Sequence, residues 1–264
     1  MNIAIINNKG GTGKTTTCVS VAASLADSGS RVLLVDLDAQ ASASLSMGVP
    51  YNALVPSVAE VLFYGLAAGK AVRHTPVARL DLLTGGMALA SADLMLSDVP
   101  GRENKLRDAL KDIRRNYDFM FFDCPPSLSM LSINALIAAD FYIIPVTAEY
   151  LALEGLISMI QAMDEVKKGM GIQPRLLGIV FTMVNPGLKS ARRIIELVKG
   201  EYGELAFETE IYRNVKLTEA PAFGKSIFQH APSSAGAEKY AALAAEIMGR
   251  CAAHKEQRRG GGAK

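Results

Sequence analysis

The chain has 264 residues, of which half are hydrophobic, and a formal net charge of +2 that neither demands nor excludes a nucleic-acid partner. Its length suits one large α/β domain; the absence of tryptophan argues against a base-stacking surface, and no apolar run is long enough to span a membrane. Cys18, Cys124 and Cys251 share no metal-ligand spacing, so we expect reduced thiols in a cytoplasmic protein.

Apolar runs of strand length alternate with helical patterns along the chain. We predict strands at 2–7, 31–38, 80–85, 119–126, 141–147 and 175–184, and helices near 14–28, 103–116, 129–139, 149–169, 189–201 and 234–253. Such alternation predicts an α/β fold, with a mostly parallel twisted sheet and helices on both faces. We expect one domain over residues 1–254, followed by a flexible, basic, glycine-rich tail at 255–264.

The segment NNKGGTGKTTT (7–17) lies between the first predicted strand and the first predicted helix, the context that a phosphate-binding loop requires. Its glycines let backbone N–H groups point into a concavity, and the helix adds its N-terminal dipole. Lys14 is expected to reach the β- and γ-phosphates of ATP, Thr15 to ligate Mg²⁺ and Thr16 to reach a phosphate oxygen. The residues expected to contact the nucleotide here are Lys9, Gly10, Gly11, Thr12, Gly13, Lys14, Thr15 and Thr16.

Carboxylates follow two of the predicted strands. VDLDAQAS (35–42) carries Asp36 and Asp38, which face the same side because alternate residues of a strand do so. FMFFDCPPS (119–127) places Asp123 after four apolar residues, a Walker B arrangement that would hold Mg²⁺ through a water molecule. We expect Asp36 to support either the Mg²⁺ shell or the loop.

The phosphate loop departs from the usual pattern, because Asn8 stands where its first glycine belongs and Lys9 follows. KGGTGKT resembles the deviant Walker A motif of a P-loop ATPase family whose members dimerise face to face around nucleotide. The resemblance implies that Lys14 serves its own nucleotide and Lys9 that of the partner, as an arginine finger does. It also implies that Asp38 is catalytic and positions the attacking water, although Ala39 replaces the proline that usually follows.

YRNVKLTEAPAFGKSI (212–227) and QHAPSSAGAEKY (229–240) resemble the corresponding stretches of Soj-like ParA partition ATPases, so the resemblance covers nearly the whole chain. It implies that Tyr212, at a position usually occupied by proline, and Asn214 contact adenine. It further implies an ATP-bound homodimer on the nucleoid. That dimer would bind double-stranded DNA without sequence preference and be released when a ParB-like partner stimulates a slow ATPase.

Binding of that kind needs lysine and arginine aligned with DNA phosphates. Gly187 stands where relatives often have arginine, so part of the usual patch is missing or moved, and nearby glutamates also permit a solvated helix face instead. The candidates are Lys189, Arg192, Arg193, Arg213, Lys216 and Lys225.

Other functions on the same fold stay open. A MinD-like membrane ATPase needs a C-terminal amphipathic helix, whereas the last predicted helix is alanine-rich with Leu243, Ile247 and Met248 as its large aliphatics, so no stable membrane anchor is expected. Related ATPases position other cargo, which the partner protein determines. A bridged iron–sulfur cluster is disfavoured by the cysteine spacing, and a metabolic ligase or kinase lacks support in the second half.

Overall fold

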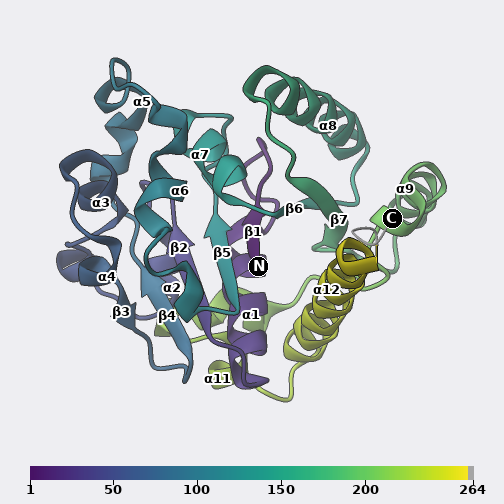
Figure 1. The fold of residues 1–264 in the computed structure, drawn as a ribbon. Coiled ribbons are helices and arrows are strands. Elements are labelled where there is room, and N and C mark those ends of the chain that lie inside the picture. The colour runs from purple at the N-terminus through teal and green to yellow at the C-terminus, as the bar shows by residue number, and fades with distance from the viewer. Residues whose placement is uncertain (261–264) are drawn as a thin grey trace.

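The computed structural model describes residues 1–260, apart from the side chains of Leu151 and of residues 257–260. Within that range, seven strands form one sheet in the order β3-β4-β2-β5-β1-β6-β7 (Figure 1). Neighbouring strands are parallel except for the short β3, which runs antiparallel to β4 at one edge. The strands are β1 (Asn2–Ile5), β2 (Val32–Asp36), β3 (Arg73–His74), β4 (Leu80–Leu83), β5 (Phe119–Asp123), β6 (Phe141–Thr147) and β7 (Arg175–Thr182).

Helices cover both faces of the sheet, as predicted (Figure 1). They are α1 (Lys14–Asp27), α2 (Ser42–Ser46), α3 (Val58–Tyr64), α4 (Ala68–Ala71), α5 (Ala92–Met95), α6 (Lys105–Leu110), α7 (Met130–Ala138), α8 (Tyr150–Met170), α9 (Lys189–Tyr202), α10 (Val215–Glu219), α11 (Ile227–His230) and α12 (Ala235–Gly260). Short 3₁₀ turns connect several of them, among them η2 (Met87–Ser91) and η6 (Ala220–Phe223).

The strands are apolar on both sides because each sheet face supports its own core. Ala4 of β1 belongs to the core that includes residues of α3, α6, α7 and α8, whereas Ile3 and Ile5 belong to the core that includes residues of α1 and α12. This alternation with a period of two continues in β2 and β5. The predicted parallel sheet with two covered faces is therefore confirmed.

The carboxyl ends of the central strands meet at one edge of the sheet. Ile5 of β1 is in register with Asp123 of β5, and Asp123 is in register with Asp36 of β2. β1 lies between β5 and β6 in the sheet. From β1 the chain continues to β2, toward one edge of the sheet, whereas from β5 it continues to β6, toward the other edge, so the direction of the connections switches at the β1–β5 pair. Ligands of open α/β sheets bind at such a point, so the topology places the candidate site here.

Some elements differ from the sequence prediction. The helix predicted near 103–116 is interrupted: α6 covers only Lys105–Leu110, with 3₁₀ turns on either side. The two-residue β3 and the short helices α2 to α5 were not predicted. α12 continues to Gly260, into the segment expected to be flexible, and residues 261–264 lie outside the described part of the chain. No described helix is both long enough and apolar enough to cross a membrane.

Candidate functional site

The loop between β1 and α1 depends on two glycines in the left-handed region. Gly11 has φ 72° and Gly13 has φ 79°, values that residues with a side chain rarely adopt. Gly13 lies beside Thr182, at the end of β7, where a Cβ atom would make an ordinary contact of 3.6 Å with the threonine side chain. The Thr182 hydroxyl donates a hydrogen bond to the backbone oxygen of Thr12 at 2.8 Å. The loop is thus fastened to a strand far away in sequence.

The two lysines of this loop have different surroundings. Lys14 is buried, its Nζ donates to the backbone oxygen of Lys9 at 3.0 Å, and burial lowers the pKa of its ammonium group. The Lys9 side chain is 45% exposed and lies 3.7 Å from a carboxylate oxygen of Glu149, just before α8. One lysine therefore belongs to the interior of the loop, and the other reaches outward.

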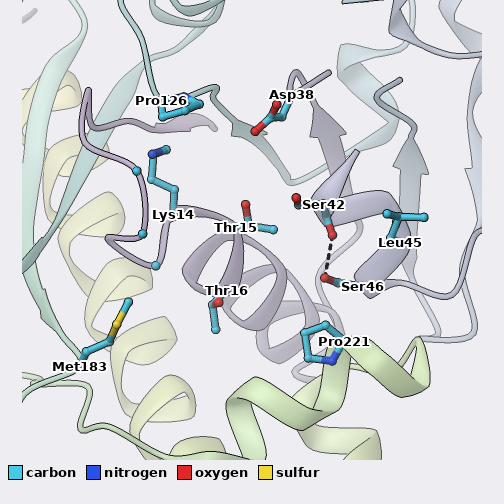
Figure 2. Close-up of a pocket in the computed structure, with 13 residues that line it drawn as sticks. Lys14, Thr15, Thr16, Asp38, Ser42, Leu45, Ser46, Pro126, Met183 and Pro221 are labelled. Carbon is cyan, nitrogen blue, oxygen red and sulfur yellow. Dashed lines mark hydrogen bonds between the residues drawn. The ribbon is translucent and has the colours of Figure 1, made fainter. Parts of the chain in front are cut away.

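A cavity of about 530 Å³ lies over the start of α1 (Figure 2). Lys14, Thr15 and Thr16 enter it from the helix, and Asp38 and Pro126 enter it from the loops after β2 and β5. The structure thus brings residues of the phosphate loop, of VDLDAQAS (35–42) and of FMFFDCPPS (119–127) to one cavity, although the predicted Asp123 itself is not among the residues that line it. The further lining residues are Gly10, Gly11, Gly13, Ser42, Leu45, Ser46, Met183 and Pro221.

A second cavity, of about 500 Å³, adjoins the first. It is lined by residues of the 211–218 segment, including Tyr212 and Asn214, by Thr182 at the end of β7 and by Tyr240 of α12. Both cavities share four lining residues: Gly13, Thr16, Met183 and Pro221. One ligand with an anionic end and a ring system could therefore occupy both.

Tyr212 and Asn214 are held by neighbouring elements. The Tyr212 ring lies 5.2 Å from Nζ of Lys239 in a cation–π arrangement. The Asn214 side-chain oxygen accepts a hydrogen bond from the N–H of Lys216 at 2.8 Å, which caps α10. With that oxygen engaged, its NH₂ group is the part left to donate to an acceptor nitrogen of a base.

Asp123 has the surroundings expected of a carboxylate that serves a cation. Its side chain is completely buried, and neither carboxylate oxygen has a hydrogen-bond partner among the described residues. Burial raises the pKa of this carboxyl well above its usual value, and the charge of Asp36 on the neighbouring strand raises it further. A buried carboxylate without partners is costly, so these oxygens fit a ligand or water shell around a cation.

The described residues contain no group of three histidine, cysteine or acidic side chains that could hold a metal by themselves. Mg²⁺ does not need such a group, because it commonly combines one or two protein oxygens with waters and substrate phosphates. Thr15 and Asp123 fit that mode of binding.

Asp36 and Asp38 are used differently. Asp36 is completely buried, and its two oxygens accept hydrogen bonds from the N–H of Asp38 and from Ser44. Burial raises the pKa of Asp36 to about 6, against the lowering effect of these hydrogen bonds. Asp38 is half-buried and lines the first cavity. Of the two options for Asp36, the geometry favours support of the loop.

The six basic residues proposed for DNA fall into two sets. Arg192 is 2.9 Å from both carboxylate oxygens of Glu210, and Lys216 is 2.8 Å from Glu219. The others are exposed and form no ion pair with the residues that the structure describes; they are Lys189, Arg193, Arg213 and Lys225.

Several residues of the site were not foreseen. Met183 follows β7 and lines both cavities. Its backbone has a positive φ of 51°, a conformation that is not predictable from a methionine in the sequence. The Tyr240 hydroxyl lies 3.1 Å from the Thr17 hydroxyl, which ties α12 to the first turn of α1. Tyr240 ends the stretch QHAPSSAGAEKY (229–240) that resembles the partition ATPases, but the sequence does not show that it lies beside the phosphate loop; the fold does.

Comparison with known proteins gives a consistent picture. A family model described as an AAA domain matches residues 1–176. The chain is 44% identical over 250 residues to the chromosome-partitioning ATPase Soj of Thermus thermophilus, covering 94% of this chain and 95% of that protein. It is 38% identical over 257 residues to the chromosome partitioning protein ParA of Myxococcus xanthus, covering 97% and 91%.

A solved structure described as cobyrinic acid a,c-diamide synthase from Mycobacterium smegmatis with bound ADP and magnesium is also similar. It has a TM-score of 0.77 and 32% identity, with 92% of each chain covered. Each of these similarities covers more than nine tenths of this chain, and so extends well beyond the residues that the family model matches.

Proposed function

The chain belongs to the ParA/Soj family of deviant Walker A P-loop ATPases, and on this premise we propose that it hydrolyses ATP to ADP and phosphate and uses that cycle to partition DNA. The observation that carries the proposal is the pair of adjoining cavities. The first is lined by the phosphate loop and Asp38, and the second by Tyr212 and Asn214. A nucleoside triphosphate would place its phosphates in the first cavity and its base in the second.

The phosphate end of the site supplies charge and orientation. Lys14 would bind the β- and γ-phosphates, supported by the N–H groups of the glycine loop and the N-terminus of α1. Thr15 and Asp123 would hold Mg²⁺, which neutralises charge on the phosphates when bound. Asp38 would orient the water that attacks the γ-phosphate. At the other end, Tyr212 would pack against adenine, and Asn214 would donate to it.

Lys9 is proposed to act in a second protomer. Its ammonium group faces outward and has a carboxylate neighbour that is itself 63% exposed, so the ion pair is easily exchanged for another anion. A homodimer formed face to face would let Lys9 reach the phosphates bound by its partner. Dimerisation would then depend on ATP, because the γ-phosphate supplies the charge that Lys9 recognises.

The ATP-bound dimer is proposed to bind double-stranded DNA without sequence preference, as a nucleoid-associated protein of the cytoplasm. The exposed cations of α9 and of the 213–225 segment support this proposal, since they are available for phosphates. Arg192 and Lys216 are expected to contribute less, because Glu210 and Glu219 already offset their charge. Release would follow when a ParB-like partner accelerates a slow intrinsic hydrolysis.

Two alternatives receive less support. For a membrane-surface ATPase, α12 would have to offer its aliphatic face to lipid, but Leu243 and Ile247 are buried against the core. For a metabolic synthase, the support is the similarity to solved structures of cobyrinic acid a,c-diamide synthase at 32% identity, whereas the relatives at 38% and 44% identity are described as partitioning proteins.

The proposal is tested by measuring ATP hydrolysis with Mg²⁺, and the variant Asp38→Ala sharpens the test. We expect slow turnover by the native chain, and ATP binding without turnover by Asp38→Ala. Hydrolysis at the native rate in that variant would assign the water-orienting role to another residue. No hydrolysis by the native chain, with or without DNA, would contradict the proposed activity.

A further inference from the structure

The loop that carries Asp38 is held in place by the buried carboxylate of Asp36. Oδ1 of Asp36 accepts a hydrogen bond from the N–H of Asp38 at 3.1 Å. The side chain of Asp36 is completely buried at the end of β2, so water does not compete for this bond. The backbone of Asp38 is therefore fixed by the residue two positions before it.

Asp36 is in turn held by Ser44 of α2. Its Oδ2 accepts hydrogen bonds from the N–H of Ser44 at 2.8 Å and from the Ser44 hydroxyl at 2.7 Å. Bonds to a charged acceptor are among the stronger ones in proteins, and two donors from one residue fix the plane of the carboxylate. Ser44 is itself completely buried, so it has no contact with solvent or with the cavity.

The Ser44 hydroxyl also accepts a hydrogen bond. The N–H of Gly85, just after β4, donates to it at 3.0 Å. The backbone there comes so close that a Cβ atom on Gly85 would lie 2.5 Å from the backbone oxygen of Asp38 and 2.8 Å from Oδ1 of Asp36. Ser44 thus occupies a junction between β2, β4 and the loop that carries Asp38.

The loop itself needs such support. Ala41 has a positive φ of 53°, an unfavourable conformation for a residue with a Cβ atom, and it is buried. Gln40 and Ala41 also donate their N–H groups back to Asp38, at 3.0 Å each. A strained turn of this kind persists only where its surroundings determine it.

We propose that Ser44 is a positioning residue for hydrolysis, which acts by locking the Asp36 carboxylate so that the Asp38 side chain is held at the first cavity. The inference rests on the proposed function, in that Asp38 orients the attacking water. It assigns no contact with nucleotide to Ser44. In this protein, where Ala39 leaves the loop without the restraint of a proline, the hydrogen-bonded junction supplies the rigidity.

The test compares Ser44→Ala with the native chain and with Ser57→Ala as a matched control. Ser57 is also buried and hydrogen-bonded, with its hydroxyl capping α3, but its side-chain hydrogen bonds stay within residues 57–60 and do not reach the Asp38 loop. Ser44→Cys keeps a hydrogen-bonding group at this position, with a larger atom and a weaker donor, and should have an intermediate effect. Urea unfolding of each variant establishes that it is folded under the assay conditions.

Two readouts are used. Hydrogen exchange of the Asp38 amide in the nucleotide-free protein should accelerate in Ser44→Ala and stay at the native rate in Ser57→Ala. The turnover number for ATP should fall about tenfold or more in Ser44→Ala, while the dissociation constant for ATP changes by no more than about threefold. A purely structural serine would lower stability without separating these two quantities.

Native exchange at Asp38 in folded Ser44→Ala overturns the inference, whether or not the native chain hydrolyses ATP. An unchanged turnover number in a native chain that does hydrolyse ATP also overturns it. If the native chain lacks hydrolysis, the proposed function fails, and the exchange measurement still decides whether Ser44 positions Asp38.

Discussion

Nζ of Lys14 donates a hydrogen bond to the backbone oxygen of Lys9, at 3.0 Å. The two ends of the phosphate loop are thus joined by the lysine that would bind phosphate. An incoming anion competes directly with this neutral carbonyl for a buried ammonium group. Charge-assisted bonds to phosphate are the stronger ones, so we expect Lys14 to turn toward the nucleotide when it binds.

Lys14→Ala should lose nucleotide binding by at least about a hundredfold, because a cation facing two phosphates is worth several kcal/mol in a dry site. Titration with a fluorescent ATP analogue measures this loss. Lys111→Ala, which changes an exposed lysine that lines neither cavity, is the control. Tight ATP binding retained by Lys14→Ala would contradict the assignment of the phosphate loop.

Lys9→Ala should bind ATP nearly as well as the native chain and yet fail to dimerise with it. The exposed ion pair with Glu149 is worth no more than about 1 kcal/mol, so the variant should remain folded. Glu149→Ala breaks the same pair but keeps the lysine, and should dimerise normally. Sedimentation with and without ATP measures both. A dimer of normal strength in Lys9→Ala would show that this lysine is merely solvated.

The two sets of basic residues should differ in DNA binding. Arg213→Ala and Lys225→Ala should each weaken binding and lower the slope of log affinity against log salt by up to about one, because each loses one phosphate contact. Lys216→Ala should have a smaller effect, since Glu219 lies 2.8 Å from its ammonium group. Equal effects of all three changes would contradict the division into paired and unpaired cations.

A close contact of two glycines, Gly48 and Gly224, should make both intolerant of substitution, and Gly48 is the one tested. Gly48 follows α2, and a Cβ atom on it would lie 2.9 Å from the backbone oxygen of Gly224, after η6. Gly29 also has a positive φ, but space around it is open. Gly29→Ala should cost about 1 kcal/mol from backbone strain alone, and Gly48→Ala at least twice that. Urea unfolding measures the free energy of unfolding of both variants. Equal losses would mean that the backbone near Gly224 moves aside without an energetic cost.

Much of the fold was accessible from sequence because its strands are continuous apolar runs and its main helices are long. The strand at 80–85 was predicted, but the short helices between residues 40 and 99 were not, since helices of four to seven residues have little periodicity. One signal was available there: Ser57 and Glu60 form a capping box at the start of α3.

The site was predicted unevenly for similar reasons. The phosphate loop is a local motif, so Lys14 and Thr15 could be identified directly. Tyr212 and Asn214 lie about 200 residues away and were found through family resemblance; the fold then placed them beside Gly13. The roles of Ser44 and Gly85 depend on contacts between β2, β4 and α2, which no single segment of sequence encodes.

The measurement that tests the account most directly is the binding of the native chain to duplex DNA of arbitrary sequence. It should be made without nucleotide, with ADP and with ATP and Mg²⁺, at two salt concentrations. We expect strong binding only with ATP and Mg²⁺, weakened steeply by salt. Equal binding in all three nucleotide states, or none in any of them, would contradict an ATP-controlled partitioning protein.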